Sequence, residues 1–235
     1  MNLDVLRRLN DARARRAASI LVTETATGDE RLLLEAEGYA DDPLREELAA
    51  RFRSGASGTV TTPEGSFFLT VNLPPPKLVV IGAVHISQAL APMAKIAGFD
   101  TTIVDPRTAF ATPDRFPGVP LVAEWPEIAL PAVGLDPFTA LAVLTHDPKI
   151  DDGALIAALK AGCFYIGALG SCKTHARRLE RLRQAGMEES TLERIHAPIG
   201  VPIAAQSPAE IAVAILAEVI ATLRSRGLEA EQAAA

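Results

Sequence analysis

The chain has 235 residues, with 23 Lys and Arg against 29 Asp and Glu, so its net charge is −6. A net acidic chain argues against nucleic acid as the main partner, because phosphate binding needs a basic face. Hydrophobic residues make up 49% of the chain, and no apolar run reaches the ~20 residues of a membrane span, so we expect a globular protein without one. Two cysteines, Cys163 and Cys172, are too few for a disulfide scaffold and favour a reducing compartment, so we expect a cytoplasmic protein.

The first 73 residues predict a small α+β domain. An amphipathic, arginine-rich stretch at 3–17 and a segment at 43–53 have helical patterns, and short apolar segments separated by turn residues predict two hairpins. The strand segments are 20–23, 32–34, 60–62 and 67–69. Three prolines at 74–76 form the linker after this domain, because they continue neither a helix nor a central strand.

From 77 to 226, predicted strands alternate with predicted helices, which favours a Rossmann-like, doubly wound parallel sheet of the α/β class. We expect strands at 78–81, 101–104, 140–144 and 164–166, and helices at 85–97, 151–161, 173–185 and 207–226. The last helix begins with a Ser-Pro-Ala-Glu capping box. In the helix at 173–185 we expect the arginines, Arg178 among them, mostly on the solvated side, and 227–235 as a flexible tail.

The first strand-to-helix turn of this domain is a partial dinucleotide-binding motif. Gly82 ends the first strand, but Val84 and Ser87 stand where a G-x-G-x-x-G motif has its other glycines. Asp105, at the end of the second strand, is placed to accept a hydrogen bond from a ribose hydroxyl. The pattern leaves the question of dinucleotide binding open.

Other polar groups fall at the same predicted edge of the sheet. Thr145 and His146 follow the strand at 140–144, and the turn at 167–171 opens a helix whose N-terminus favours an anion, although a tight turn without a ligand fits equally. Three of the four histidines lie at strand ends or helix starts.

No C-x-x-C, H-E-x-x-H or G-x-S-x-G motif occurs, so we expect neither a structural metal nor a serine hydrolase. Cys163 is expected to be buried. Cys172 opens a helix, where a thiolate is stabilised, but its simplest interpretation is a small residue without a chemical role.

Residues 77–223 resemble the C-terminal Rossmann domain of the XdhC/CoxI family, accessory proteins of xanthine dehydrogenase and carbon monoxide dehydrogenase type enzymes. The motifs that carry the resemblance are Pro-Pro-Lys-Leu-Val-Val-Ile-Gly-Ala-Val-His at 75–85, Val-Asp-Pro-Arg at 104–107, Leu-Thr-His-Asp at 144–147, Tyr-Ile-Gly-Ala-Leu-Gly-Ser at 165–171, Thr-His at 174–175, Arg-Ile-His-Ala-Pro-Ile-Gly at 194–200 and Ser-Pro-Ala-Glu-Ile-Ala at 207–212. As an ordered set over most of this domain, they are far more specific than the glycine turn alone.

The resemblance implies an accessory chaperone rather than an enzyme. Such a protein binds the molybdenum cofactor, as molybdopterin or its cytosine dinucleotide form, protects it during sulfuration and delivers it to a molybdenum hydroxylase. The implied cofactor-binding residues are Gly82, His85, Asp105, Arg107, Thr145, His146, Gly167, Gly170, Ser171, Thr174, His175, His196 and Gly200. The turns after Gly82 and Gly167 are expected to seat phosphate, Asp105 to accept from the ligand, and three histidines to line the mouth. These are His146, His175 and His196.

Two features depart from the family pattern. Val84 replaces the usual second glycine, and the first 73 residues, which look abbreviated, lack the cysteine of a Ser-Gly-Gly-Cys-type segment. The resemblance implies a molybdenum hydroxylase and a sulfurtransferase as partners. Because of the missing segment, we also expect a separate polypeptide that supplies it, and the prevalence of symmetric dimers favours a homodimer. Two alternatives stay open: an NAD(P)-dependent oxidoreductase, and a non-catalytic module that recruits the sulfurtransferase or the target enzyme.

Overall fold

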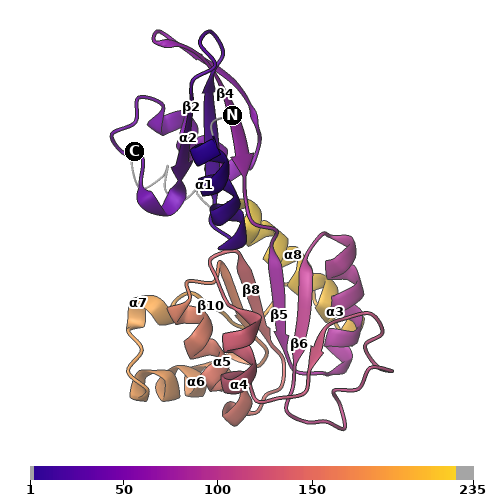
Figure 1. Ribbon diagram of the computed structural model, residues 1–235. Helices are drawn as coiled ribbons and strands as arrows, with labels where there is room; N and C mark the ends of the chain where they lie inside the picture. The colour runs from indigo at the N-terminus through magenta and orange to yellow at the C-terminus, as the bar shows by residue number, and fades with distance from the viewer. Residues whose placement is uncertain (1–2, 226–235) are drawn as a thin grey trace. The chain divides into compact units, whose positions relative to one another are not determined.

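The computed structural model describes residues 3–225, which form two compact units (Figure 1). The division falls between Pro74 and Pro75, inside the run of three prolines. The expected tail at 227–235 lies outside the described residues. None of the helices in the described part is long and apolar enough to cross a membrane.

The N-terminal unit is a four-stranded antiparallel sheet with the strand order β2-β1-β4-β3. Its elements are α1 (Leu3–Ala14), β1 (Ser19–Glu24), β2 (Glu30–Leu34), the short 3-10 helix η1 (Glu35–Glu37), α2 (Arg45–Ser54), β3 (Gly58–Thr62) and β4 (Gly65–Asn72). The two predicted hairpins, β1–β2 and β3–β4, join through the pairing of β1 with β4. Leu9 of α1 packs with Leu21 and Leu32 of the sheet in a small apolar cluster.

The second unit is a six-stranded parallel sheet with the order β10-β9-β8-β5-β6-β7. The strands are β5 (Lys77–Ile81), β6 (Asp100–Val104), β7 (Leu121–Val122), β8 (Thr139–Val143), β9 (Tyr165–Ala168) and β10 (Ile195–His196). The chain builds outward from β5 through β6 to β7, and then returns to place β8 on the other side of β5. This order is that of the Rossmann fold and confirms the predicted doubly wound sheet.

Helices cover both faces of this sheet (Figure 1). They are α3 (His85–Ile96), α4 (Pro126–Val133), α5 (Pro148–Lys160), α6 (Cys172–Gln184), α7 (Glu189–Leu192) and α8 (Pro208–Ser225). Leu78 and Val80 of β5 face α3 and α8, whereas Val79 and Ile81 face the layer of α4, α5 and α6. Both sides of the central strands are therefore buried, which explains their continuous apolar sequences.

Several local predictions differ from the structure. Residues 194–200 contain the short strand β10, and neither this strand nor β7, α4 and α7 was among the predicted elements. Arg178 departs from the arginines expected mostly on the solvated side of this helix, because the residue is 2% exposed. Arg178 precedes Leu182 by four residues, so the two share the buried face of α6. The capping box of α8 is confirmed: the Glu210 amide donates to Ser207 Oγ, and the Ser207 amide donates to Glu210 Oε2.

Candidate functional site

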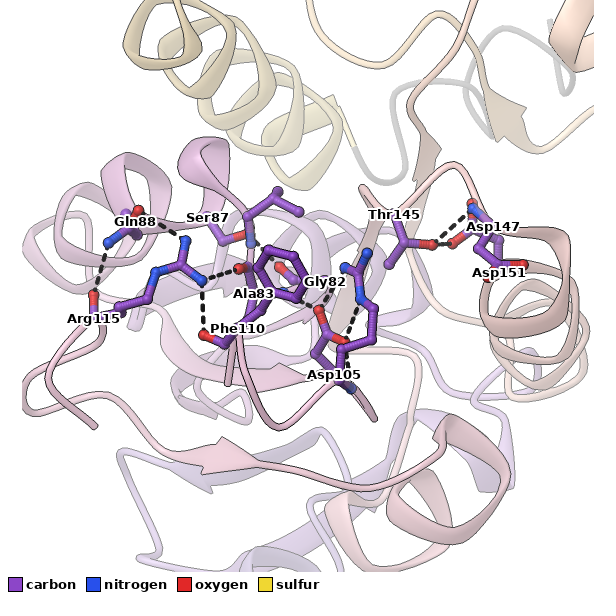
Figure 2. A network of polar contacts seen from close by, with 12 residues as sticks. Gly82, Ala83, Ser87, Gln88, Asp105, Phe110, Arg115, Thr145, Asp147 and Asp151 are labelled. Carbon is purple, nitrogen blue, oxygen red and sulfur yellow. Dashed lines mark hydrogen bonds and ion pairs between the residues drawn. The ribbon is translucent and has the colours of Figure 1, made fainter. Parts of the chain in front are cut away.

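The sheet reverses its winding between β5 and β8, and the residues that follow these two strands lie against each other. Gly82 has φ +118°, and a Cβ atom on it would come within 2.9 Å of Thr145 Cγ2. Both the backbone conformation and the space therefore require glycine here. Ligands of doubly wound sheets bind at such a switch point, so the candidate site is centred on these two residues (Figure 2).

The turn after β5 uses its own N–H groups within the protein. The Gly82 amide donates to the last carbonyl of β6 (2.8 Å), and the Ala83 amide donates to Asp105 Oδ2 (2.7 Å). The Val84 amide donates to Ser87 Oγ (3.2 Å), and the Ser87 hydroxyl donates back to the Gly82 carbonyl. Three successive donors are thus engaged, in a turn where a dinucleotide-binding protein directs N–H groups at the pyrophosphate.

Asp105 is fully buried and holds Arg107. Its carboxylate accepts hydrogen bonds from the Ala83 amide, the Arg107 amide (2.9 Å), Arg107 Nε (2.9 Å) and Arg107 Nη2 (2.7 Å). Burial raises the pKa of this carboxyl, but the hydrogen bonds from Arg107 and the two amides outweigh burial and hold the pKa below its usual range. Four donors fill the acceptor sites of a carboxylate. In this arrangement Asp105 positions Arg107 and offers no free acceptor to a ligand, in contrast to its expected role.

Hydrogen bonds of Arg115 hold the segment after Arg107 against the Gly82 turn (Figure 2). Arg115 Nη1 donates to the carbonyls of Ala83 (2.9 Å) and Phe110 (2.8 Å), and its Nη2 donates to Gln88 Oε1 (3.2 Å). The guanidinium carbons of Arg107 and Arg115 lie 4.8 and 5.7 Å from the centre of the Phe110 ring. The switch point is therefore bordered by two fixed guanidinium groups and a half-exposed aromatic ring.

On the other side of the switch point, Thr145 connects β8 to α5. Its hydroxyl donates to the buried carboxylate of Asp151 and accepts from the Asp147 amide (3.1 Å) (Figure 2). Burial raises the pKa of Asp151 to about 6, while the Thr145 hydrogen bond and the Arg178 charge act in the opposite direction. His146, between these residues, is exposed and has φ +64°.

The turn between β9 and α6 is the second glycine turn at this edge. Gly170 has φ +136°, and Ser171 caps α6 by accepting from the Thr174 amide (3.3 Å). The Ser171 and Thr174 hydroxyls lie 3.1 Å apart, and His175 is half-buried behind them. Polar groups of the predicted set therefore gather here as well.

The other two predicted glycines have packing roles. A Cβ on Gly167 would lie 2.5 Å from the Tyr165 hydroxyl and 2.6 Å from Ile199 Cδ1, so this position has no room for a side chain. A Cβ on Gly200, which has φ +93°, would lie 3.0 Å from the backbone of α8. These contacts account for both glycines without a ligand.

Glu218 of α8 organises the region around these two glycines. It accepts hydrogen bonds from the Tyr165 hydroxyl (2.6 Å) and the Gly200 amide (2.7 Å), and its Oε1 lies 3.3 Å from His196 Nδ1. Burial and the Glu218 carboxylate raise the pKa of Tyr165. The His196 and Tyr165 rings lie 4.8 Å apart. His196 is thus held by a carboxylate on the α8 side of the sheet.

The structure divides the predicted cofactor-binding residues into three groups. Around the switch point are Gly82, His85, Asp105, Arg107, Thr145 and His146; at the N-terminus of α6 are Gly170, Ser171, Thr174 and His175; beside α8 are Gly167, His196 and Gly200. Their contact with a cofactor stays a prediction. The sequence reasoning missed the polar partners Arg115, Asp151, Arg178 and Glu218. Of these, Asp151, Arg178 and Glu218 each stand three or four residues from a buried apolar residue of their own helix, a spacing that could have revealed them.

The cysteines and potential metal ligands add little to the site. Cys163 is buried as expected, and burial, together with Asp136, raises the pKa of its thiol to about 12. Cys172 is exposed at the start of α6. Within residues 3–225, no group of three or more His, Cys, Asp or Glu side chains is arranged to hold a metal ion.

Comparison with known proteins places this domain in a family. Residues 78–219, more than half of the chain, match the family model described as the XdhC Rossmann domain. The uncharacterized protein YqeB of Escherichia coli is 33% identical over 157 residues, 66% of this chain and 29% of YqeB. A probable xanthine dehydrogenase subunit from Bacillus subtilis is 33% identical over 63% of this chain and 43% of its own length. The molybdenum cofactor insertion chaperone PaoD of Escherichia coli is 32% identical over 61% of this chain and 39% of PaoD.

A solved crystal structure has a similar fold. The crystal structure of a xanthine dehydrogenase from Bacillus halodurans superimposes with a TM-score of 0.64 at 23% identity, over 94% of this chain and 64% of that one. The matched region spans less than half of each of the three sequence relatives, so their full activities are not transferred by the match. The family model and the Rossmann strand order agree, and the chain belongs to the XdhC family.

Proposed function

We propose that this protein is a maturation factor that binds the molybdenum cofactor as cargo and passes it to a molybdenum hydroxylase of the xanthine dehydrogenase type. Family membership and the names of two relatives, a molybdenum cofactor insertion chaperone and a probable xanthine dehydrogenase subunit, support this function. The cargo is the molybdopterin form of the cofactor or its cytosine dinucleotide form. The predicted cofactor-binding residues line the carboxyl edge of the sheet and its flank beside α8.

The single observation that carries the proposal is the arrangement of Asp105 and Arg107 at the switch point. The buried carboxylate fixes the guanidinium, whose side chain is 34% exposed, in one orientation by two side-chain hydrogen bonds. A fixed, partly exposed guanidinium recognises an anionic oxygen group with little loss of entropy. The phosphate-bearing pterin of the proposed cargo carries such groups.

The same arrangement opposes the alternative of an NAD(P)-dependent oxidoreductase. That activity needs the Gly82 turn to donate to a pyrophosphate and Asp105 to accept from a ribose. Here the Ala83 amide donates to Asp105, so neither this N–H group nor this carboxylate is free to bond to a dinucleotide. We therefore propose a cargo other than a nicotinamide dinucleotide.

Further steps of the proposal come from the family resemblance. The bound cofactor is protected while a sulfurtransferase sulfurates it, in the cytoplasm, and is then delivered to the hydroxylase. A homodimer, and a separate polypeptide with the cysteine that residues 1–73 lack, belong to the same proposal. A recruiter that binds partners without cofactor is the outcome if no cargo is found.

The test is the ligand content of the full chain, expressed in cells that make the cofactor and purified without oxygen. Released material is oxidised and assayed for fluorescent pterin, and NAD(H) and NADP(H) are titrated in parallel against emission of Trp125, which is 40% exposed. We expect close to one pterin per chain and no nicotinamide binding. Replacement of Arg107 by Met should lower pterin retention, while Arg183→Met, which alters an exposed ion pair of α6, should leave it unchanged. Nicotinamide binding without pterin would overturn the proposal.

A further inference from the structure

Three buried nitrogen atoms on one face of α6 lack hydrogen-bond partners. They are His175 Nδ1, Arg178 Nε and Arg178 Nη1, and the described part of the chain has no other buried side-chain nitrogen or oxygen of this kind. Buried polar groups in folded proteins are almost always paired, with protein, water or a bound ion. Three unpaired atoms on neighbouring residues therefore indicate a position where an additional acceptor belongs.

The backbone above these atoms also offers donors. The N–H groups of Gly170, Ser171, Cys172 and Lys173 make no hydrogen bond within residues 3–225. The first turn of this 13-residue helix carries no acidic side chain, so the positive end of its dipole is uncompensated. Free amides at a helix N-terminus bind phosphate and similar anions.

Arg178 joins the two sets of donors. Its Nη2 donates to the Leu169 carbonyl (2.8 Å) and lies 3.8 Å from the position that a Cβ on Gly170 would take. The guanidinium therefore lies directly beneath the turn whose amides are free. Thr174 Cγ2 lies 3.1 Å from the same Cβ position, and both Ser171 and Thr174 are exposed, so the turn itself faces solvent.

No carboxylate occupies Arg178 in place of a ligand. Asp151 and Asp152 act on its charge from a distance, but neither bonds to it. Asp152 is held by Arg181 through two hydrogen bonds (2.5 and 2.9 Å), and Asp151 accepts the Thr145 hydroxyl. A buried guanidinium with its donors unused is costly unless an acceptor arrives.

We infer that the N-terminal turn of α6, together with Arg178 and His175 beneath it, binds a phosphate or diphosphate group. The amides of residues 170–173 and the guanidinium donate to its oxygens, and the neutral His175 ring, with its hydrogen on Nδ1, supplies a further donor. The identity of the molecule that carries the group rests on the proposed function, in which it is the phosphate of the pterin or the diphosphate of its dinucleotide form. The Gly82 turn does not serve this purpose, because its amides are engaged.

The test uses inorganic diphosphate and inorganic phosphate with the full chain. Calorimetric titration should show binding that weakens about ten-fold or more in Arg178→Lys, which keeps the charge but loses the paired N–H groups. The matched control is Arg177→Lys, the same exchange at an exposed neighbour, which should bind as the unaltered chain does. In the unaltered chain, NMR signals of Arg178 Nε–H and the His175 ring should shift on titration, so the test is decided even if Arg178→Lys fails to fold.

The outcomes separate this inference from the proposed function. Binding of diphosphate that depends on Arg178, in a protein that never carries pterin, supports the anion site and contradicts the proposed cargo. Pterin bound equally by the unaltered chain and by Arg178→Lys, without any shift of the Arg178 and His175 signals on addition of diphosphate, overturns the anion site and leaves the proposed function standing. Equal weakening in Arg177→Lys and Arg178→Lys would also overturn it, because it would mean that only the net charge matters.

Discussion

Two glycine turns follow strands of the same parallel sheet, β5 and β9, yet they use their hydrogen-bond donors in opposite ways. In the turn after β5, the amides of Gly82, Ala83 and Val84 are all bonded within the protein, to β6, Asp105 and Ser87. In the turn after β9, the four amides at 170–173 have no partner in the described chain, and an underlying arginine has unused donors. A glycine at a strand end therefore does not by itself make an anion site; the side chains around it decide.

The first turn is held by a buried carboxylate, and removing it should have the largest effect. Asp105→Ala leaves the Ala83 amide and Arg107 without their acceptor, so we expect a loss of about 3–5 kcal/mol in the free energy of unfolding, measured by urea denaturation. Because the folded-state pKa of Asp105 is lowered, its contribution is present above about pH 4 and is lost as the pH falls through the folded pKa. Glu189→Ala, which removes an exposed ion pair with Arg183, should cost less than about 1 kcal/mol. Similar losses in both variants would contradict a structural role for Asp105.

Between the two turns, under the end of β8, Asp151 predicts a pH effect of opposite sign. Its folded-state pKa is raised to about 6, so the folded protein holds this proton more tightly than the unfolded chain does. Stability should therefore decrease as the pH rises from about 4 to about 6, by about 2–3 kcal/mol. Unfolding measured across this range should show the decrease in the unaltered chain and a flatter profile in Asp151→Asn. An unchanged profile in that variant would assign the effect to other groups.

The two turn serines should differ by a smaller amount. Ser87 is buried, and its hydroxyl both accepts from the Val84 amide and donates to the Gly82 carbonyl, so Ser87→Ala should cost about 2 kcal/mol. Ser171 is an exposed N-cap, and Ser171→Ala should cost about 1 kcal/mol. Thermal unfolding of both variants checks the order, and a larger loss at Ser171 would contradict the contrast between a closed and an open turn.

Much of the architecture follows from local sequence patterns. Apolar runs such as 78–81 and 140–144, each bounded by glycine or polar residues, predict strands buried on both faces, and the structure places them at the centre of the sheet. The strands β7 and β10, of two residues each, are too short to leave a periodic pattern. Helix α4 contains Pro131, which argues against a helix when only the sequence is read.

The site was less accessible to sequence reasoning because its partners meet only in the folded chain. Arg115 reaches the Ala83 carbonyl from a loop 32 residues away, and nothing in its local sequence predicts that contact. Arg178 was grouped with the arginines expected mostly on the solvated side, although its spacing from Leu182 places it on the buried face of α6. Ser87, in contrast, stands in the sequence where a dinucleotide motif has glycine, and this substitution already indicates a turn that closes on itself.

The most direct test compares nitrogen-15 NMR spectra of the full chain with and without inorganic diphosphate. We expect the amides at 170–173 to change their chemical shifts on diphosphate binding, while those of Gly82, Ala83 and Val84 keep their hydrogen bonds within the protein and change little. Large shifts at 82–84 with none at 170–173 would contradict this expectation, because the first turn would then be the one that holds the ligand.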